Sequence, residues 1–179
     1  MKDRVKIKMA KVIWLTGISG SGKTTLGGLL KIVLEKNRGQ VEFLDGDMVR
    51  KFFRDDLGYS REERIMNVKR IAFAAMLVAK QGTPVIVANI APYYEARDFI
   101  RESIPDYIQI YLKTSVEKVM ERDVKGHYAR YKDGIEKNLV GVDDEYDVPR
   151  NPHLIVDTQY DSVEESLQKI LNYLKTQGV

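Results

Sequence analysis

The sequence predicts an α/β fold in which helices cover both faces of a parallel five-stranded sheet. Short apolar segments rich in β-branched residues alternate with longer amphipathic segments, which is the order that parallel strands joined by crossover helices produce. A glycine-rich segment follows the first apolar one and precedes the first amphipathic one. At 179 residues the chain suits a single domain, so we expect one domain over residues 1–179.

The strands are expected where the sequence is short, apolar and β-branched. These segments are Val12–Thr16, Val41–Leu44, Val85–Asn89, Tyr107–Leu112 and Leu154–Val156.

Helix boundaries are expected at capping signals. The first helix should run from near Gly22 to about Lys36. A second should begin at Ser60, because Ser60 and Glu63 have the spacing of a capping box, and it should continue toward Lys80.

Two later helices are predicted in the same way. Thr114 and Glu117 repeat the capping-box spacing before a helix over Val116–Arg122. Asp161 is expected to cap the last helix, whose apolar residues share one face. Those residues are Val163, Leu167, Ile170, Leu171 and Leu174.

The segment from about 125 to 152 is polar, contains several glycines and prolines, and has weak periodicity. Irregular segments of this length inside a compact domain are usually functional, and we expect this one to form a lid.

Composition excludes several classes of protein. Hydrophobic residues make up 44% and charged residues 31%, and the formal charge of +3 is too small and dispersed to indicate a nucleic-acid partner. Cysteine is absent, which excludes disulfides, thiolate metal sites and cysteine nucleophiles. The first eleven residues are basic without the apolar run of a signal peptide, and no segment has the length of a membrane span. We therefore expect a cytoplasmic protein that binds no membrane.

The glycine-rich segment matches a phosphate-binding motif. Residues 17–24 satisfy G-x-x-x-x-G-K-[ST], with an apolar strand before them and a helical pattern after them. Glycines let backbone N–H groups converge on phosphate oxygens, the lysine reaches the β- and γ-phosphates, and the threonine hydroxyl ligates Mg²⁺. A chance glycine-rich turn is the alternative, which the flanking strand and helix make much less favourable. The expected nucleotide-binding residues are Gly17, Ser19, Gly20, Ser21, Gly22, Lys23, Thr24 and Thr25.

The rest of the chain favours a small-molecule kinase among P-loop proteins. The guanine-reading N-K-x-D motif is absent, and Val85–Asn89 does not end in the acidic pair of a motor ATPase. A lid suits a kinase because it keeps water from accepting the phosphoryl group. We expect ATP and Mg²⁺ as cofactors and a small molecule as the acceptor.

An Asp-Gly-Asp sequence ends the second predicted strand, where ligands bind in open α/β sheets. Asp45 and Asp47 can flank a metal ion and a hydroxyl, with Arg50 on the same side of a helical turn. A strand-ending turn with a helix cap explains the same residues.

Two further groups of polar residues have alternative explanations. Arg64, Asn67 and Arg70 recur every three residues, so they either hold an anionic substrate or form a solvated helix face. Arg122 and Lys125 lie near a predicted helix end, where they complement its dipole or close over a triphosphate.

In order along the chain, these motifs resemble the adenylyl-sulfate kinase family over nearly the whole length. The landmarks are GxSGSGKTT at 17–25, LDGDxVR at 44–50, LGYSxxxR at 57–64 followed by Asn67, APYxxxR at 91–97, RDVKGxY at 122–128, G-x-D-D-x-Y at 141–146 and DT at 157–158. The resemblance implies a P-loop kinase fold, transfer of the ATP γ-phosphoryl group to the 3′-hydroxyl of adenosine 5′-phosphosulfate, and a possible homodimer.

The resemblance also implies residue roles. Lys23 and Asp47 would be catalytic, with Asp47 orienting or deprotonating the acceptor hydroxyl, and Thr24 and Asp45 would serve the metal ion. Arg122 would lie near the nucleotide. The acceptor would be held by Asp47, Arg50, Tyr59, Arg64, Asn67, Ile90, Lys125 and Leu139.

Three positions depart from the family pattern. Met48 stands where asparagine is usual, Ala91 replaces a serine, and Leu139 replaces a phenylalanine that stacks on the acceptor's adenine. A lost base stack costs roughly 1–3 kcal/mol. A different nucleotide-linked acceptor, such as a cytidine diphosphate derivative, is therefore an alternative. A catalytically silent nucleotide-binding module that regulates a partner is another.

Overall fold

The computed structural model describes residues 9–179, so residues 1–8 of the basic N-terminal stretch lie outside the described part of the chain. Five parallel strands form one sheet in the order β2-β3-β1-β4-β5, as the sequence predicts. Their bounds are β1 Val12–Thr16, β2 Glu42–Asp45, β3 Val85–Ala88, β4 Tyr107–Lys113 and β5 Leu154–Asp157.

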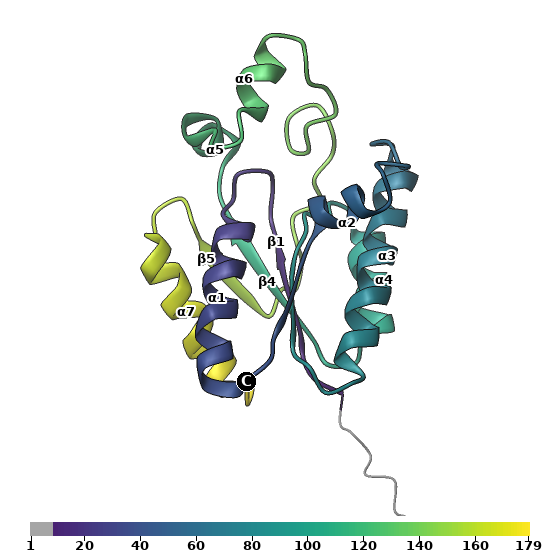
Figure 1. The fold of residues 1–179 in the computed structure, drawn as a ribbon. Helices are drawn as coiled ribbons and strands as arrows, with labels where there is room; N and C mark the ends of the chain where they lie inside the picture. Colours follow the sequence, from purple (N-terminus) through teal and green to yellow (C-terminus); the bar gives the residue numbers. More distant parts are fainter. Residues whose placement is uncertain (1–8) are drawn as a thin grey trace, which may run out of the picture.

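Helices cover both faces of this sheet, which confirms the predicted α/β fold (Figure 1). α1 and α7 lie on one face, and α3 and α4 lie on the other. α5, α6 and the loop after them stand beyond the end of the sheet, over the loop between β1 and α1. The bounds are α1 Lys23–Arg38, α2 Gly46–Phe52, α3 Arg61–Ala79, α4 Tyr94–Ser103, α5 Val116–Arg122, α6 His127–Lys132 and α7 Val163–Thr176.

The central strand β1 is apolar at every position but its last because it is buried on both faces of the sheet. Val12 and Trp14 point into the core under α3 and α4, and Ile13 and Leu15 point into the core under α1 and α7. Both faces of a parallel sheet are covered, so alternation of apolar and polar residues disappears.

Capping interactions confirm one predicted capping box and correct the capping residue of two other helices. Ser60 and Glu63 form the predicted reciprocal capping box of α3. α5 begins as predicted, but Ser115 caps it in place of Thr114, because the Ser115 side chain accepts a hydrogen bond from the Lys118 backbone N–H.

The cap of α7 was predicted one residue too early. Ser162 caps this helix, since Glu165 stands three residues after it and completes a capping box. Asp161 instead forms an ion pair with Lys169, whose Nζ lies 2.7 Å from Oδ2 of Asp161. Ile170 and Leu174 are buried as predicted, whereas Val163 at the first turn is 42% exposed.

Helices α4 and α6 have no counterpart in the sequence predictions. α4 spans ten residues and buries Ala96, Arg97 and Ile100 on one face, so its helical periodicity was present in the sequence and was missed. α6 spans only six residues inside the lid, which is too short for periodicity to mark it as a helix. None of the helices in the described part of the chain is long and apolar enough to span a membrane.

Two neighbouring glycines in α1 provide a test of how tightly this helix packs on the sheet. A Cβ added at Gly27 would lie 2.5 Å from Cε2 of Phe43, whereas one added at Gly28 would meet nothing within 4 Å. We predict that Gly27→Ala lowers the melting temperature, since overpacking costs about 1–3 kcal/mol. Gly28→Ala should raise it, because alanine favours a helix over glycine by about 1 kcal/mol. Thermal unfolding of both variants measures this, and equal shifts would show that the Phe43 contact does not restrict α1.

Candidate functional site

Three strands end at the same edge of the sheet and open into one cavity. β1, β2 and β3 are parallel neighbours, so the loops after Thr16, Asp45 and Ala88 converge. The cavity here has a volume of about 890 Å³, which is large enough for a nucleotide-sized ligand. Residues from the P-loop, α2, α3 and the lid line it together.

The P-loop is shaped by glycines whose conformations and surroundings exclude side chains. Gly17 has φ of 152°, and a Cβ there would lie 2.6 Å from the Leu112 carbonyl oxygen. Gly22 has φ of 94° and precedes α1 without any side chain capping that helix. The N–H groups that begin α1 are therefore left without a side-chain acceptor, and an anion can bind them.

Lys23 folds back onto the P-loop. Its Nζ donates hydrogen bonds to the carbonyl oxygens of Gly17 and Ile18, both at 2.7 Å. Burial, and secondarily the positive charge of Lys125, lower the pKa of Lys23 to about 7, although Asp47 and Asp45 act in the opposite direction. The ammonium thus has carbonyl partners that compensate its charge poorly, and a phosphate would compensate it better.

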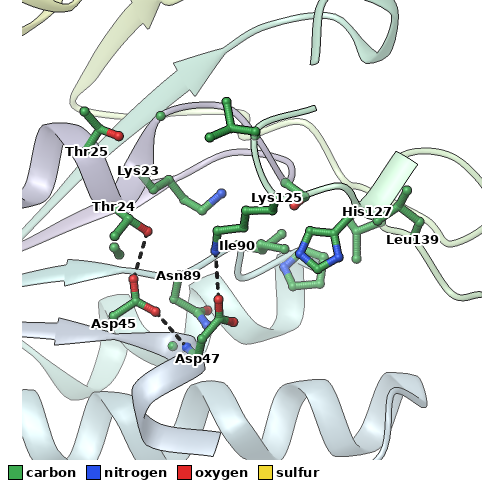
Figure 2. Close-up of a pocket in the computed structure, with 18 of the residues that line it drawn as sticks. Lys23, Thr24, Thr25, Asp45, Asp47, Asn89, Ile90, Lys125, His127 and Leu139 are labelled. Atoms are coloured by element: carbon green, nitrogen blue, oxygen red, sulfur yellow. Dashed lines mark hydrogen bonds and ion pairs between the residues drawn. The ribbon is translucent and has the colours of Figure 1, made fainter. Parts of the chain in front are cut away.

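Asp45 connects the P-loop helix to α2. Its Oδ2 accepts from the Thr24 hydroxyl at 2.8 Å, and its Oδ1 accepts from the Asp47 backbone N–H at 2.8 Å (Figure 2). The helix-cap explanation therefore holds for Asp45, which is the N-cap of α2. Asp47 does not cap the helix, and its carboxylate reaches into the cavity.

The Thr24 and Asp45 oxygens are of the kind that a hard cation prefers. Among the described residues, no group of three or more His, Asp or Glu side chains could hold a metal ion. A cation here would take most of its ligands from phosphate and water, which is how Mg²⁺ binds in nucleotide sites.

Asp47 forms an ion pair with the lid. Its Oδ2 lies 2.9 Å from Nζ of Lys125, which follows α5 (Figure 2). Burial acts to raise the pKa of Asp47, but the hydrogen bond and charge of Lys125 outweigh it and hold that pKa below its usual range. The same pair raises the pKa of Lys125 although burial opposes the shift. The pair is ionised, and both of its side chains line the cavity.

Arg64 and Asn67 form the wall opposite the P-loop. Arg64 is 8% exposed; its guanidinium donates to the carbonyl oxygens of Tyr59 and Asn138 and pairs with Asp144 at 2.9 Å. Asn67 is 3% exposed, and its Oδ1 faces no hydrogen-bond partner in the described part of the chain. A buried amide oxygen without a partner at a cavity wall is a ready acceptor for a ligand N–H or O–H.

The structure separates Arg70 from this wall. Arg70 forms a two-point ion pair with Asp56 at 2.7 and 2.8 Å and lies over the ring of Phe53, away from the cavity. Arg50 does line the cavity, and its guanidinium lies 4.7 Å from the centre of the Tyr59 ring. Of the three residues that recur every three positions, Arg64 and Asn67 line the cavity and Arg70 forms a surface ion pair.

Most of the predicted site residues meet in this cavity, and two do not line it. Ser21 is fully buried, and Gly17 packs against β4, so both shape the loop from behind. Those that line the cavity are Ser19, Gly20, Gly22, Lys23, Thr24, Thr25, Asp45, Asp47, Arg50, Tyr59, Arg64, Asn67, Ile90, Arg122, Lys125 and Leu139.

Sequence reasoning missed several residues that the fold brings to the cavity. Asn89 and Pro92 follow β3, and Ser162 and Ser166 begin α7 beside Thr158. No spacing marks them, because their place depends on strand order. His127 and Glu136 of the lid also line the cavity, and their contact spans a loop that local patterns do not predict.

Comparisons with known proteins agree with this geometry. Residues 9–157 match the family model described as Adenylylsulphate kinase. The chain is 40% identical over 174 residues to a probable adenylyl-sulfate kinase of Aeropyrum pernix, covering 94% of each chain. It is 41% identical over 167 residues to a probable bifunctional SAT/APS kinase 2 of Sorangium cellulosum, covering 93% of this chain and 29% of that longer protein. The structure of a Mycobacterium tuberculosis APS kinase in complex with AMPPNP and APS has a TM-score of 0.88 and 32% identity, covering 93% of this chain and 98% of that one.

The lowered pKa of Lys23 predicts that nucleotide binding takes up a proton. With a pKa of about 7 in the free protein, Lys23 is mostly neutral at pH 8, and a bound triphosphate raises that pKa because it favours the ammonium. Calorimetry of ATP binding at pH 8, in buffers of different ionisation enthalpy, should show uptake approaching one proton. At pH 6 the uptake should vanish, because Lys23 is already charged. Lys23→Arg is the control, since its guanidinium stays charged and removes the uptake at both values.

Proposed function

The chain belongs to the adenylylsulphate kinase family, and on that premise we propose that it transfers the γ-phosphoryl group of ATP to the 3′-hydroxyl of adenosine 5′-phosphosulfate. The product is 3′-phosphoadenosine 5′-phosphosulfate. One observation carries this proposal: a single cavity is lined by the P-loop on one side and by Arg64 and Asn67 on the other, with Asp47 between them. A donor and an acceptor in that cavity would meet at Asp47.

The donor end suits ATP. The uncapped start of α1 offers backbone N–H groups to the phosphates, and Lys23 adds a cation whose present partners are only carbonyl groups. Arg122 donates a hydrogen bond to the Thr158 carbonyl, and the Thr158 hydroxyl donates to the Ser21 carbonyl, so the Arg122 guanidinium is held beside the P-loop. We assign the nucleotide phosphates to the P-loop and the remainder of ATP to the region of Arg122.

Mg²⁺ belongs beside Thr24 and Asp45 in this proposal. When bound, the ion would neutralise charge on the triphosphate during transfer. The Thr24 hydroxyl and the Asp45 carboxylate already lie together at 2.8 Å, which supports their assignment as direct or water-mediated ligands.

The acceptor end suits an anionic nucleotide. Arg50 and Arg64 supply charge, the exposed Tyr59 ring supplies a stacking surface, and Asn67 supplies an unpartnered amide oxygen. Asp47 would accept a hydrogen bond from the reacting hydroxyl and orient it, and Lys125 would then be free to approach the transferred phosphoryl group. Ile90 and Leu139 add apolar surface to this end. Catalysis is then mainly positioning and charge stabilisation.

The departures from the family pattern do not support a different acceptor equally. Met48 is 49% exposed and does not line the cavity, so it gives no support to an altered acceptor. Leu139 lines the cavity without a π-face, and it favours the second candidate, a cytidine diphosphate derivative as acceptor. The intact set of Lys23, Thr24, Asp45 and Asp47 argues against a silent regulatory module.

A coupled ADP-release assay with MgATP and a panel of acceptors tests the proposal. We expect saturable turnover with adenosine 5′-phosphosulfate and little with cytidine diphosphate derivatives. The reverse preference would keep the kinase and replace the acceptor. Lys23→Ala should abolish turnover while leaving the circular dichroism spectrum unchanged, and full activity in that variant would refute the assigned donor site.

The role of Asp47 gives a separate prediction. Asp47→Asn should lower kcat by about 10²-fold or more, because a positioned carboxylate contributes on that order to proton transfer. The KM for ATP should change little, since Asp47 lies on the acceptor side. Asp98→Asn, which alters an exposed carboxylate on α4, is the matched control and should behave as the wild type. A kcat for Asp47→Asn close to the wild-type value would remove Asp47 from the mechanism.

Two further expectations are proposals. We place the enzyme in the cytoplasm, where ATP is available. The homodimer implied by the resemblance is tested by light scattering, which distinguishes it from a monomer by mass.

A further inference from the structure

Three side chains of the lid form a network at the acceptor end of the cavity. His127 is the first residue of α6, and its Nδ1 lies 2.5 Å from Oε1 of Glu136. Arg130 of the same helix donates from Nε to the other carboxylate oxygen of Glu136 at 3.0 Å. Both His127 and Glu136 line the cavity.

This network determines which ring nitrogen carries hydrogen. An ionised carboxylate can only accept hydrogen bonds, so the nitrogen facing Glu136 must be protonated. Nδ1 therefore carries the hydrogen and donates to Glu136, and in this tautomer the lone pair is on Nε2. Arg130 Nη2 also lies 3.0 Å from Nδ1, but it cannot donate to a nitrogen that already carries a hydrogen.

Nε2 is left facing ligand space. The two ring nitrogens point in divergent directions, so Nε2 turns away from Glu136. No residue in the described range 9–179 forms a hydrogen bond with Nε2. Figure 2 shows the His127 ring between Lys125 and Leu139, on the side of the cavity where Asp47 lies.

A purely structural role explains only half of this arrangement. The contact between Nδ1 and Glu136 links α6 to the loop after it, and Arg130 already makes the same link through Glu136. Nε2 takes no part in this link. The His127 side chain is 71% covered, yet Nε2 has no hydrogen-bond partner in the described part of the chain. A lone pair held in a set direction at the wall of an acceptor site has the features of a group that binds a hydroxyl.

We propose that Nε2 of His127 accepts a hydrogen bond from the 2′-hydroxyl of the acceptor ribose, beside the 3′-hydroxyl that Asp47 orients. Glu136 is a positioning residue that fixes the tautomer and direction of the ring. The inference rests on the proposed function in one respect, namely that the acceptor is a ribonucleotide. His127 then makes the kinase selective for ribose over 2′-deoxyribose at the acceptor.

The test compares one enzyme on two substrates. kcat/KM is measured with adenosine 5′-phosphosulfate and with its 2′-deoxy counterpart, and the ratio of the two values cancels any loss of folded enzyme. We expect the wild type to prefer the ribose form by about fivefold, the value of one ordinary hydrogen bond. In His127→Phe, which keeps a ring but removes both nitrogens, the ratio should fall to near one.

Two further variants separate positioning from packing. Glu136→Gln keeps a carbonyl oxygen that can accept from Nδ1–H, so it should keep the preference, whereas Glu136→Leu should lose it. Lys132→Met, on the exposed side of α6, is the control and should keep the wild-type ratio. An unchanged ratio in His127→Phe overturns the proposal, even if both substrates are turned over more slowly.

Failure of the proposed function looks different from failure of this inference. If the wild type does not phosphorylate adenosine 5′-phosphosulfate, the ratio is measured with the nucleotide of the panel that it does phosphorylate and the 2′-deoxy form of that nucleotide. If no acceptor turns over, calorimetric affinities for adenosine 5′-phosphosulfate and its 2′-deoxy form in the presence of MgADP replace kcat/KM. Equal affinities for the two forms in the wild type would overturn the role of His127.

Discussion

The Asp45 carboxylate fixes the distance between the P-loop and the start of α2, where Asp47 lies. Asp45 ends β2, caps α2 through the Asp47 N–H and accepts from the Thr24 hydroxyl at the start of α1. The chain packs closely against β3 here, because a Cβ at Gly46 would clash with the Asn89 side chain. The spacing between the P-loop and Asp47 therefore depends on strand order and on Asp45, and the lid does not determine it. An in-line transfer needs that spacing to be constant.

The cations of the site have internal partners. Lys23 binds P-loop carbonyls, and Lys125 binds Asp47, with side chains that are 48% and 67% exposed in the Lys125–Asp47 pair. Exposed ion pairs contribute only about 0–1 kcal/mol, so exchanging such a partner for a substrate group costs little. Burial of Lys23 also favours ligand binding. It makes the ammonium less stable in the unliganded protein, and a bound phosphate would stabilise that charge. Lys23 and Lys125 are thus available to ligands without a strong internal ion pair that must first be broken.

Local pattern was sufficient for the strands, the P-loop and the capping box at Ser60, because each depends on residues close together in the sequence. It failed by one residue at Ser115 and Ser162, where adjacent residues offered similar caps. It could not predict the contact of Arg64 with Asn138, which spans 74 residues, nor separate Arg64 from Arg70 on the same helix. Such contacts depend on where the chain returns from the lid to the sheet, and the spacing of residues along one helix does not predict that position.

That return divides the lid into a root, residues 138–147, and a tip around Val124 and Ile135, whose side chains are exposed. Arg64 pairs with Asp144, and the buried Arg97 donates to the carbonyl oxygens of Ala91 and Asp147, so two arginines of the helices on one face tie the root to the sheet. Breaking a buried pair on one side costs about 3–5 kcal/mol, which makes the root the more stable part. At the tip, Val124 and Ile135 are 88% and 72% exposed although they line the cavity. Leu139 belongs to the root and packs with Ile18 and Tyr128, and the Tyr128 hydroxyl donates to the Ser19 carbonyl, so α6 is held against the P-loop as well. The acceptor wall that includes Leu139, His127 and Glu136 is therefore in place before the substrates bind, and the exposed side chains at the tip are the part that a substrate can still cover.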